Sequence, residues 1–193
     1  MMGEIEKKIQ KDITILKEFL PEHKRTWEKL LQEIKTLLPI LTNQSEEIIH
    51  VESVNSSNDD YLRQIQSELI VCIDREIDRT FCQLKDKITN LKRVDNEAKN
   101  KIDKLEESTT WLDWTSKSKV ICGSTIQPPL KELLMYCRIY RTTFIEHSEN
   151  IFHLFSNLNV KNRESVQAFK RYFEANLIAS DDISFLLQML NNM

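Results

Sequence analysis

One apolar stripe keeps helical spacing without a break from Leu62 to Leu105. Its twelve steps span 43 residues, a mean of about 3.6 residues per step, which is the period of a straight α-helix. A helix of that length would measure roughly 65 Å, more than the diameter of a compact domain of this size. The pattern therefore predicts one long helix over 61–107 and an elongated molecule. The stripe consists of Leu62, Ile65, Leu69, Ile73, Ile77, Phe81, Leu84, Ile88, Leu91, Asp95, Ala98, Ile102 and Leu105.

A polar residue, Asp95, occupies one position of this stripe. From Leu84 onward the stripe also fits heptads with charged residues on the other faces, which is the pattern of helices that pack along a seam. A polar residue at such a position can fix the register of the packed helices or can simply face solvent. Both interpretations of Asp95 stay open from the sequence.

Glycine is almost absent, since the 193 residues include only Gly3 and Gly123. Walker and dinucleotide-binding loops need several glycines, so nucleotide binding by those routes is excluded. Tight β-hairpins favour Asn-Gly or Asp-Gly, and neither dipeptide occurs. The abundant Glu, Lys, Leu and Ile are typical of helices. We expect an all-α fold: an elongated antiparallel helical bundle with a long central helical hairpin and short C-terminal helices.

The N-terminal helices are expected over 4–54, where apolar residues recur at three- and four-residue steps. Proline has no backbone N–H to continue the helical hydrogen bonds. We therefore expect Pro21 to interrupt the first helix or to begin a new one, and Pro39 to kink the segment. Trp27 lies inside this regular stripe and is expected in the core.

Turn-forming residues divide the rest of the chain. The run NSSNDD at 55–60 predicts a hinge, with Asp59 or Asp60 capping the long helix. Ser/Thr clusters, a glycine and a proline pair predict a connection over 108–128. C-terminal helices over 129–193 follow, and the first of them should fold back along the long helix.

Within this last region, two short amphipathic helices are expected at about 162–175 and 181–192. Ser180 is placed to cap the second of them. A length of 193 residues fits one domain of ordinary size or two very small ones, and we interpret 1–193 as a single helical domain.

The sequence contains no recognisable catalytic or metal-binding set. The four cysteines show no CxxC motif and have no neighbouring histidine, so reduced thiols are expected. Glu149 and His153 share a helix face, but two ligands do not make a metal site. No serine stands in a nucleophile elbow. We expect no catalytic residue, no metal, no cofactor and no enzymatic activity.

Charge and hydropathy favour a soluble protein. Twenty-seven basic and 30 acidic residues give a net charge of -3, so bulk electrostatics implies neither nucleic acid nor an anionic membrane as a partner. The charged N-terminus lacks an apolar signal core, and no segment reaches the about 20 apolar residues that span a bilayer. We expect a cytoplasmic protein, with the nucleus as a second location.

Trp111 and Trp114 are the most informative pair of apolar residues outside the long stripe. They stand three residues apart, beside the expected connection, and tryptophan is enriched at interface hot spots. Two interpretations stay open: both side chains anchor a partner protein, or both close one end of the core.

Two segments show a family pattern. Residues 19–41, FLPEHKRTWEKLLQEIKTLLPIL, contain an apolar-Pro step, a tryptophan six residues later, and a leucine-rich helix with a second proline. Residues 128–155 form a Pro-led helix with an aromatic-basic step at Arg138, Tyr140 and Arg141. In both segments the chain resembles the AIRIM family, small helical ribosome maturation factors that work with AAA+ ATPases of the spermatogenesis-associated type.

This resemblance implies a non-catalytic adaptor subunit. Such a subunit would pair with a small helical protein of the cyclin-dependent-kinase-2-interacting type, dock on an ATPase hexamer and act on late pre-60S particles. The matching residues Arg138, Tyr140 and Arg141 are then candidates for partner binding. Beyond them the family stays strongly basic, whereas this chain has Glu146 and Glu149, so an electrostatic contact on that face is in question.

Two other function classes compete with this adaptor. One is a structural coiled-coil subunit of a tethering or kinetochore-like assembly, which the long heptad pattern would also suit. The other is an exchangeable lipid-surface protein, which the near balance of charge on the helices disfavours.

Overall fold

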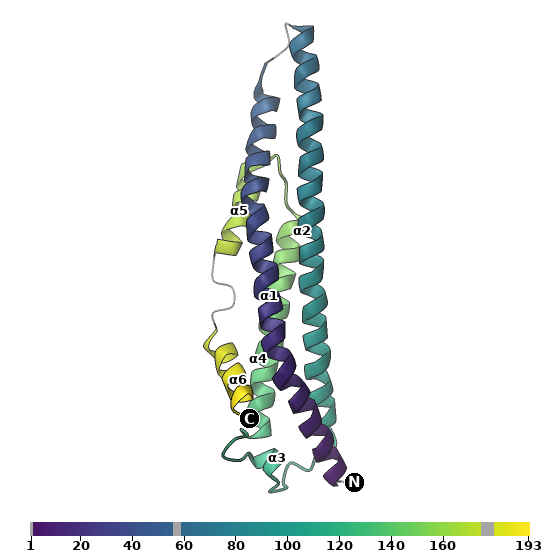
Figure 1. Ribbon diagram of the computed structural model, residues 1–193, viewed down its shortest axis with the longest axis vertical. Coiled ribbons are helices and arrows are strands. Elements are labelled where there is room, and N and C mark those ends of the chain that lie inside the picture. The colour runs from purple at the N-terminus through teal and green to yellow at the C-terminus, as the bar shows by residue number, and fades with distance from the viewer. Residues whose placement is uncertain (1, 56–58, 175–179) are drawn as a thin grey trace. The chain divides into compact units, whose positions relative to one another are not determined.

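A computed structural model describes residues 2–55, 59–174 and 180–193 as helices and connecting turns, without strands in those ranges (Figure 1). The all-α prediction is confirmed. The helices are α1 (Met2–Ser53), α2 (Asp60–Ser108), α3 (Lys119–Cys122), α4 (Leu130–Ser156), α5 (Arg163–Glu174) and α6 (Asp181–Asn192).

The expected start of the long helix is correct to within a residue. Asp59 caps α2, because its Oδ1 accepts hydrogen bonds from the backbone N–H groups of Tyr61 at 2.9 Å and Leu62 at 3.2 Å. Residues 56–58 of the expected hinge lie outside the described residues. Ser180 precedes α6 as expected, but its side chain makes no capping hydrogen bond.

The prediction that Pro21 interrupts the first helix is wrong, because α1 runs through both prolines as one helix of 52 residues. A proline inside a helix costs about 3 kcal/mol through the lost hydrogen bond and its ring clash. Apolar side chains on both sides of Pro21, including Leu16, Leu20 and Trp27, are buried, and their burial offsets that cost. The kink expected at Pro39 stays a prediction.

The chain forms two compact units, which we describe separately. The first contains the described parts of residues 1–28, 91–149 and 177–193, and the second contains residues 29–90 and the described part of 150–176. The expectation of one domain over 1–193 stays a prediction.

In the first unit, α1 and α4 both run antiparallel to α2. Ser108 Oγ donates to Asp12 Oδ2 at 2.7 Å, while His23 meets Asp95, so residue numbers rise along α1 as they fall along α2. The fully buried Trp27 packs edge-on against Phe144 of α4, with ring centroids 5.2 Å apart, as its core prediction required. The predicted return of α4 along α2 is also confirmed.

In the second unit, α1 again packs antiparallel to α2, and the end of α4 and α5 complete the core. Phe155 of α4 contacts Phe81 of α2, with ring centroids 5.4 Å apart, and Phe169 of α5 lies 6.3 Å from Phe155. Ser45 Oγ donates to the backbone oxygen of Val160 at 2.6 Å, which joins the turn between α4 and α5 to α1.

The apolar stripe of α2 is buried over only part of its length in the second unit. Leu84 and Ile88 are fully buried and Ile73 is 7% exposed, whereas Leu69 is 45% exposed. Leu62 and Ile65 are similarly exposed. The stripe therefore predicts the helix correctly but does not show how much of that helix the core covers.

Candidate protein-docking site

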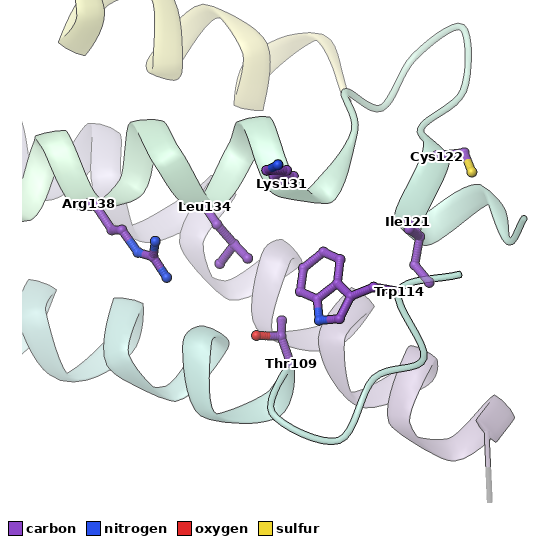
Figure 2. A pocket seen from close by; sticks show the side chains of 7 residues that line it. All are labelled: Thr109, Trp114, Ile121, Cys122, Lys131, Leu134 and Arg138. Atoms are coloured by element: carbon purple, nitrogen blue, oxygen red, sulfur yellow. The ribbon is translucent and has the colours of Figure 1, made fainter. Parts of the chain in front are cut away.

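A cavity of about 560 Å³ lies in the first unit, between the turn after α2, the short helix α3 and the start of α4. Figure 2 shows the indole of Trp114 between the end of α2 and the first turns of α4, close to Leu134. We call this cavity the Trp114 pocket. It is lined by Thr109, Trp114, Ile121, Cys122, Lys131, Leu134 and Arg138.

One face of α4 forms a wall of the Trp114 pocket. Lys131, Leu134 and Arg138 follow the i, i+3, i+7 spacing that places side chains on one side of a helix. Leu134 is buried and gives the wall an apolar centre, while two cationic side chains flank it. The pocket therefore combines an apolar floor with a basic rim.

The turn after α2 holds the two tryptophans outward. Leu112, between them, is 6% exposed and anchors the turn in the core, whereas Trp111 is 83% and Trp114 45% exposed. Asp113 Oδ1 accepts hydrogen bonds from Thr115 Oγ1 at 2.7 Å and Thr115 N at 3.0 Å. These bonds, the side-chain bond first, lower the pKa of Asp113 and keep the turn closed.

A glycine directly follows the pocket residues Ile121 and Cys122. Gly123 follows α3 with φ +82° and ψ -179°, a backbone conformation that residues other than glycine rarely adopt. A Cβ at this position would lie 2.7 Å from the backbone oxygen of Gln127 and 2.8 Å from the nitrogen of Pro129. The chain can return to the start of α4 so tightly because this residue is glycine.

The three basic and aromatic candidates on α4 lie in different surroundings. Arg138 reaches the Trp114 pocket and its Nε donates to Glu106 Oε1 at 2.5 Å. Arg141 pairs with Asp103 and Glu106. Burial by itself lowers the pKa of Arg141, but the hydrogen bonds to these two acids outweigh burial and raise it. Tyr140 is fully buried, so its side chain is not on the surface that we expected it to share with Arg138.

Tyr140 instead belongs to a buried polar cluster with His23, Trp27 and Asp95, all exposed by 3% or less. His23 Nδ1 lies 2.8 Å from the Tyr140 hydroxyl, and His23 Nε2 lies 3.1 Å from Asp95 Oδ1. Trp27 Nε1 donates to Asp95 Oδ2 at 3.4 Å. Asp95 therefore does not face solvent. Burial of Tyr140, and then the nearby charge of Asp95, raise the pKa of Tyr140.

The hydrogen bonds of this cluster link α1, α2 and α4. The Tyr140 hydroxyl donates to the backbone oxygen of Leu20 at 3.0 Å. His23 contacts Tyr140 through Nδ1 and Asp95 through Nε2. Because these buried side chains are hydrogen-bonded to one another across three helices, we interpret the cluster as a structural device that sets helix register.

The described residues contain neither a metal-binding cluster nor a membrane-spanning helix. No three His, Cys, Asp or Glu side chains of that part of the chain gather as a metal ion would require. No helix in the described ranges is both long and apolar enough to cross a bilayer.

Comparison with protein families decides the broad assignment. The family described as "Ribosome biogenesis protein C1orf109-like" matches residues 7–190, nearly the whole chain. The chain belongs to this family. AIRIM is another name for the same family, so the resemblance expected from residues 19–41 and 128–155 is confirmed at that level. A comparison with curated proteins gave no match.

For this C1orf109-like protein, the sequence indicated only part of the Trp114 pocket. Trp114 and Arg138 were candidates for partner binding, and both line this one cavity. Lys131 and Leu134 were missed, although their spacing with Arg138 is a signal that could have found them. Ile121 could not be placed from the sequence, because a single helical turn inside a long connection has no periodicity to read.

Proposed function

We propose that this chain acts in ribosome maturation as a non-catalytic adaptor that binds other proteins through its helix surfaces. The family assignment supports the ribosomal role. The observation that supports the adaptor role is the pair of outward tryptophans beside an apolar, basic-rimmed pocket. An alternative role as a coiled-coil tethering or kinetochore-like subunit gains nothing from the family match.

The physical argument for docking rests on exposed apolar area. Trp111 leaves most of its large ring in water, and burying such a side chain at an interface is worth about 2 kcal/mol or more. The ring of Trp114 is half covered and forms the lip of a cavity that an inserted side chain could fill. An aliphatic or aromatic side chain fits the floor, and a carboxylate beside it would meet Lys131 and Arg138.

The resemblance supplies the partners of this proposal. They are a small helical protein and an AAA+ ATPase, with a late pre-60S particle as the substrate of the assembly. We place this work in the cytoplasm, with the nucleus as a second location. Arg138 would contact the partner directly, while Arg141, held by two acids of α2, would position that helix.

The test is affinity purification of the tagged full chain from cells, followed by mass spectrometry and by sedimentation with ribosomal particles. We expect an AAA+ ATPase and pre-60S proteins to co-purify with the wild type. The variant Trp111→Ala/Trp114→Ala should recover at least about tenfold less ATPase, because truncated hot-spot tryptophans commonly cost more than 1.4 kcal/mol of binding.

The matched control is Ile40→Ala on α1, which removes a 47% exposed apolar side chain from the second unit. It should recover the ATPase at the wild-type level, and both variants should melt like the wild type. Absence of an ATPase from the wild-type complex would refute the proposed partner. Full recovery with the tryptophan variant would refute the proposed surface.

A further inference from the structure

The apolar stripe of α2 continues beyond the residues on which it packs. Ile73 and Ile77 are 7% and 9% exposed, and one and two turns earlier on the same helix face Leu69 and Ile65 are 45% and 42% exposed. Leu62, still earlier, is 51% exposed. Leu62, Ile65 and Leu69, which continue the buried stripe of α2, are therefore exposed to solvent.

Together with the end of α1, these residues form a groove of about 310 Å³ in the second unit. We call it the α1–α2 groove. Gln66 Nε2 donates to the backbone oxygens of Val51 at 2.7 Å and Val54 at 3.0 Å, at the C-terminal end of α1. This side chain holds the two walls together, so the groove is already formed. Its lining is His50, Val51, Val54, Asn55, Leu62, Ile65, Gln66 and Leu69.

In this unit, α4 and the turn between α4 and α5 contact α1 and α2 outside the groove. Phe155 of α4 meets α2 at Phe81, which lies about 18 Å along the helix from Leu69 at 1.5 Å per residue. The turn between α4 and α5 reaches α1 through Lys161, which pairs with Glu52. At 100° per residue, Glu52 points about 200° away from the groove residue His50 around α1, so the contact with Lys161 lies toward the other side of that helix.

The helix segments on either side of the groove are strongly acidic. Residues 46–79 contain nine acidic and three basic side chains, a net charge of -6 against -3 for the whole chain. All twelve are exposed. Two of the three arginines already pair with acids of α2, Arg63 with Asp60 and Arg79 with Glu76. A ligand of this groove therefore meets an apolar floor inside a negative field.

We infer that the α1–α2 groove binds a basic amphipathic helix of a partner protein, which rests on the proposed adaptor function. Apolar residues at three- and four-residue steps on that helix would continue the seam of Ile73 and Ile77. Lysine or arginine on its flanks would face acids such as Glu47 and Glu68. A second copy of this chain would bring a second charge of -6 to the first, so the occupant is a different protein.

The experiment uses the full chain and two fluorescent peptides of about 20 residues. Both have leucine at heptad seam positions; one has lysine at the flanking positions and the other has glutamate there. We expect the lysine peptide to bind, its affinity to fall with salt, and the glutamate peptide to bind at least about a hundredfold more weakly. Failure of the lysine peptide to bind, or equal binding of both, overturns the inference.

Two variants locate the binding. Leu62→Ser/Ile65→Ser/Leu69→Ser should weaken the lysine peptide at least tenfold, and Glu47→Lys/Glu68→Lys should weaken it in a salt-dependent way. The variant Trp111→Ala/Trp114→Ala should bind the peptide like the wild type, which separates this site from the Trp114 pocket. Unchanged binding by the triple-serine variant, or a dimer of the wild type that this variant dissociates, overturns the inference.

Discussion

His23 Nε2 lies 3.1 Å from Asp95 Oδ1, although 72 residues separate the two along the chain. Both side chains are buried, and Trp27 and Tyr140 complete their hydrogen bonds. A shift of α1 by one turn against α2 would separate the imidazole from the carboxylate and leave a buried charge without a partner. The pair therefore ties the register of two long helices to one set of contacts.

Removal of this carboxylate should destabilise the fold strongly. Asp95→Ala leaves His23 and Trp27 without their buried acceptor, and the loss of one partner of such a pair costs about 3 to 5 kcal/mol. Urea unfolding followed by circular dichroism measures the effect. The control Glu97→Ala removes an exposed acid that pairs with Arg93 and should cost about 0.5 kcal/mol or less. Equal losses from both substitutions would contradict a role for the buried cluster.

The two halves of the α2 stripe should respond differently to polar substitution. Leu84→Asp/Ile88→Asp/Leu91→Asp places three charges at positions that are at most 1% exposed, and each lost side chain costs about 2 to 5 kcal/mol. We expect this variant to lose its cooperative thermal transition. Serine at Leu62, Ile65 and Leu69 should leave the melting temperature within a few degrees. A cooperative melt of the aspartate variant would show that the stripe is not core.

A methyl group at Gly123 should strain the backbone next to the Trp114 pocket. Gly123→Ala forces a side chain into a backbone region with a penalty on the order of 1 to 3 kcal/mol and pushes its Cβ against Gln127. We expect lower stability and a changed tryptophan emission. Gly3→Ala is the control, because nothing lies within 4 Å of the added methyl. If the two alanine variants melt alike, the tight return after α3 is not needed.

Acid should weaken the fold partly through Asp103. Burial opposes ionisation, but hydrogen bonds from Lys99 and Arg141 lower the pKa of Asp103 below its usual 3.8. The ionised carboxylate therefore stabilises the fold above about pH 3.8, and this contribution is lost as the pH falls through the folded pKa. Asp103→Asn should lower the free energy of unfolding at pH 7 and converge with the wild type in acid. Urea unfolding from pH 2 to 7 checks this, with the exposed Asp86→Asn expected to follow the wild type.

The four cysteines should differ in reactivity. Cys72, Cys82 and Cys122 are exposed, whereas burial, and then the charge of Glu106, raises the pKa of Cys137 to about 12. The thiolate is the nucleophile, so maleimide at pH 7 should label three sites in the native protein and four in urea. Mass spectrometry counts the labels. Native labelling of Cys137 would show that the α4 face opens.

Fold class and most helix boundaries were readable from the sequence, because they depend on local chemistry. A 3.6-residue apolar period places α2, and the short side chain of Asp59 caps it through two adjacent backbone N–H groups. Pro21 misled the prediction for the same reason. Its local penalty is real, but the burial of distant apolar contacts, which a sequence window does not contain, outweighs it.

The candidate sites were only half predictable. The sequence marked Trp111 and Trp114 but left open whether they close the core, and their exposure follows from the buried Leu112 between them. The family resemblance grouped Tyr140 with Arg138 as partner-binding candidates. Residues two positions apart on a helix point about 200° apart, and the packing of α4 buries Tyr140 and exposes Arg138.

By itself, the sequence determined that this chain is helical, where the long helix α2 runs and to which family the chain belongs, because periodicity, caps and residue patterns are local. Only the tertiary structure decided that Leu69 is exposed while Ile73 is buried, and that His23 meets Asp95. The apolar spacing is the same at Leu69 and at Ile73, so the spacing does not distinguish the exposed residue from the buried one. Which turn is covered depends on where neighbouring helices end and in what register they pack, and those are properties of residues far apart in the chain.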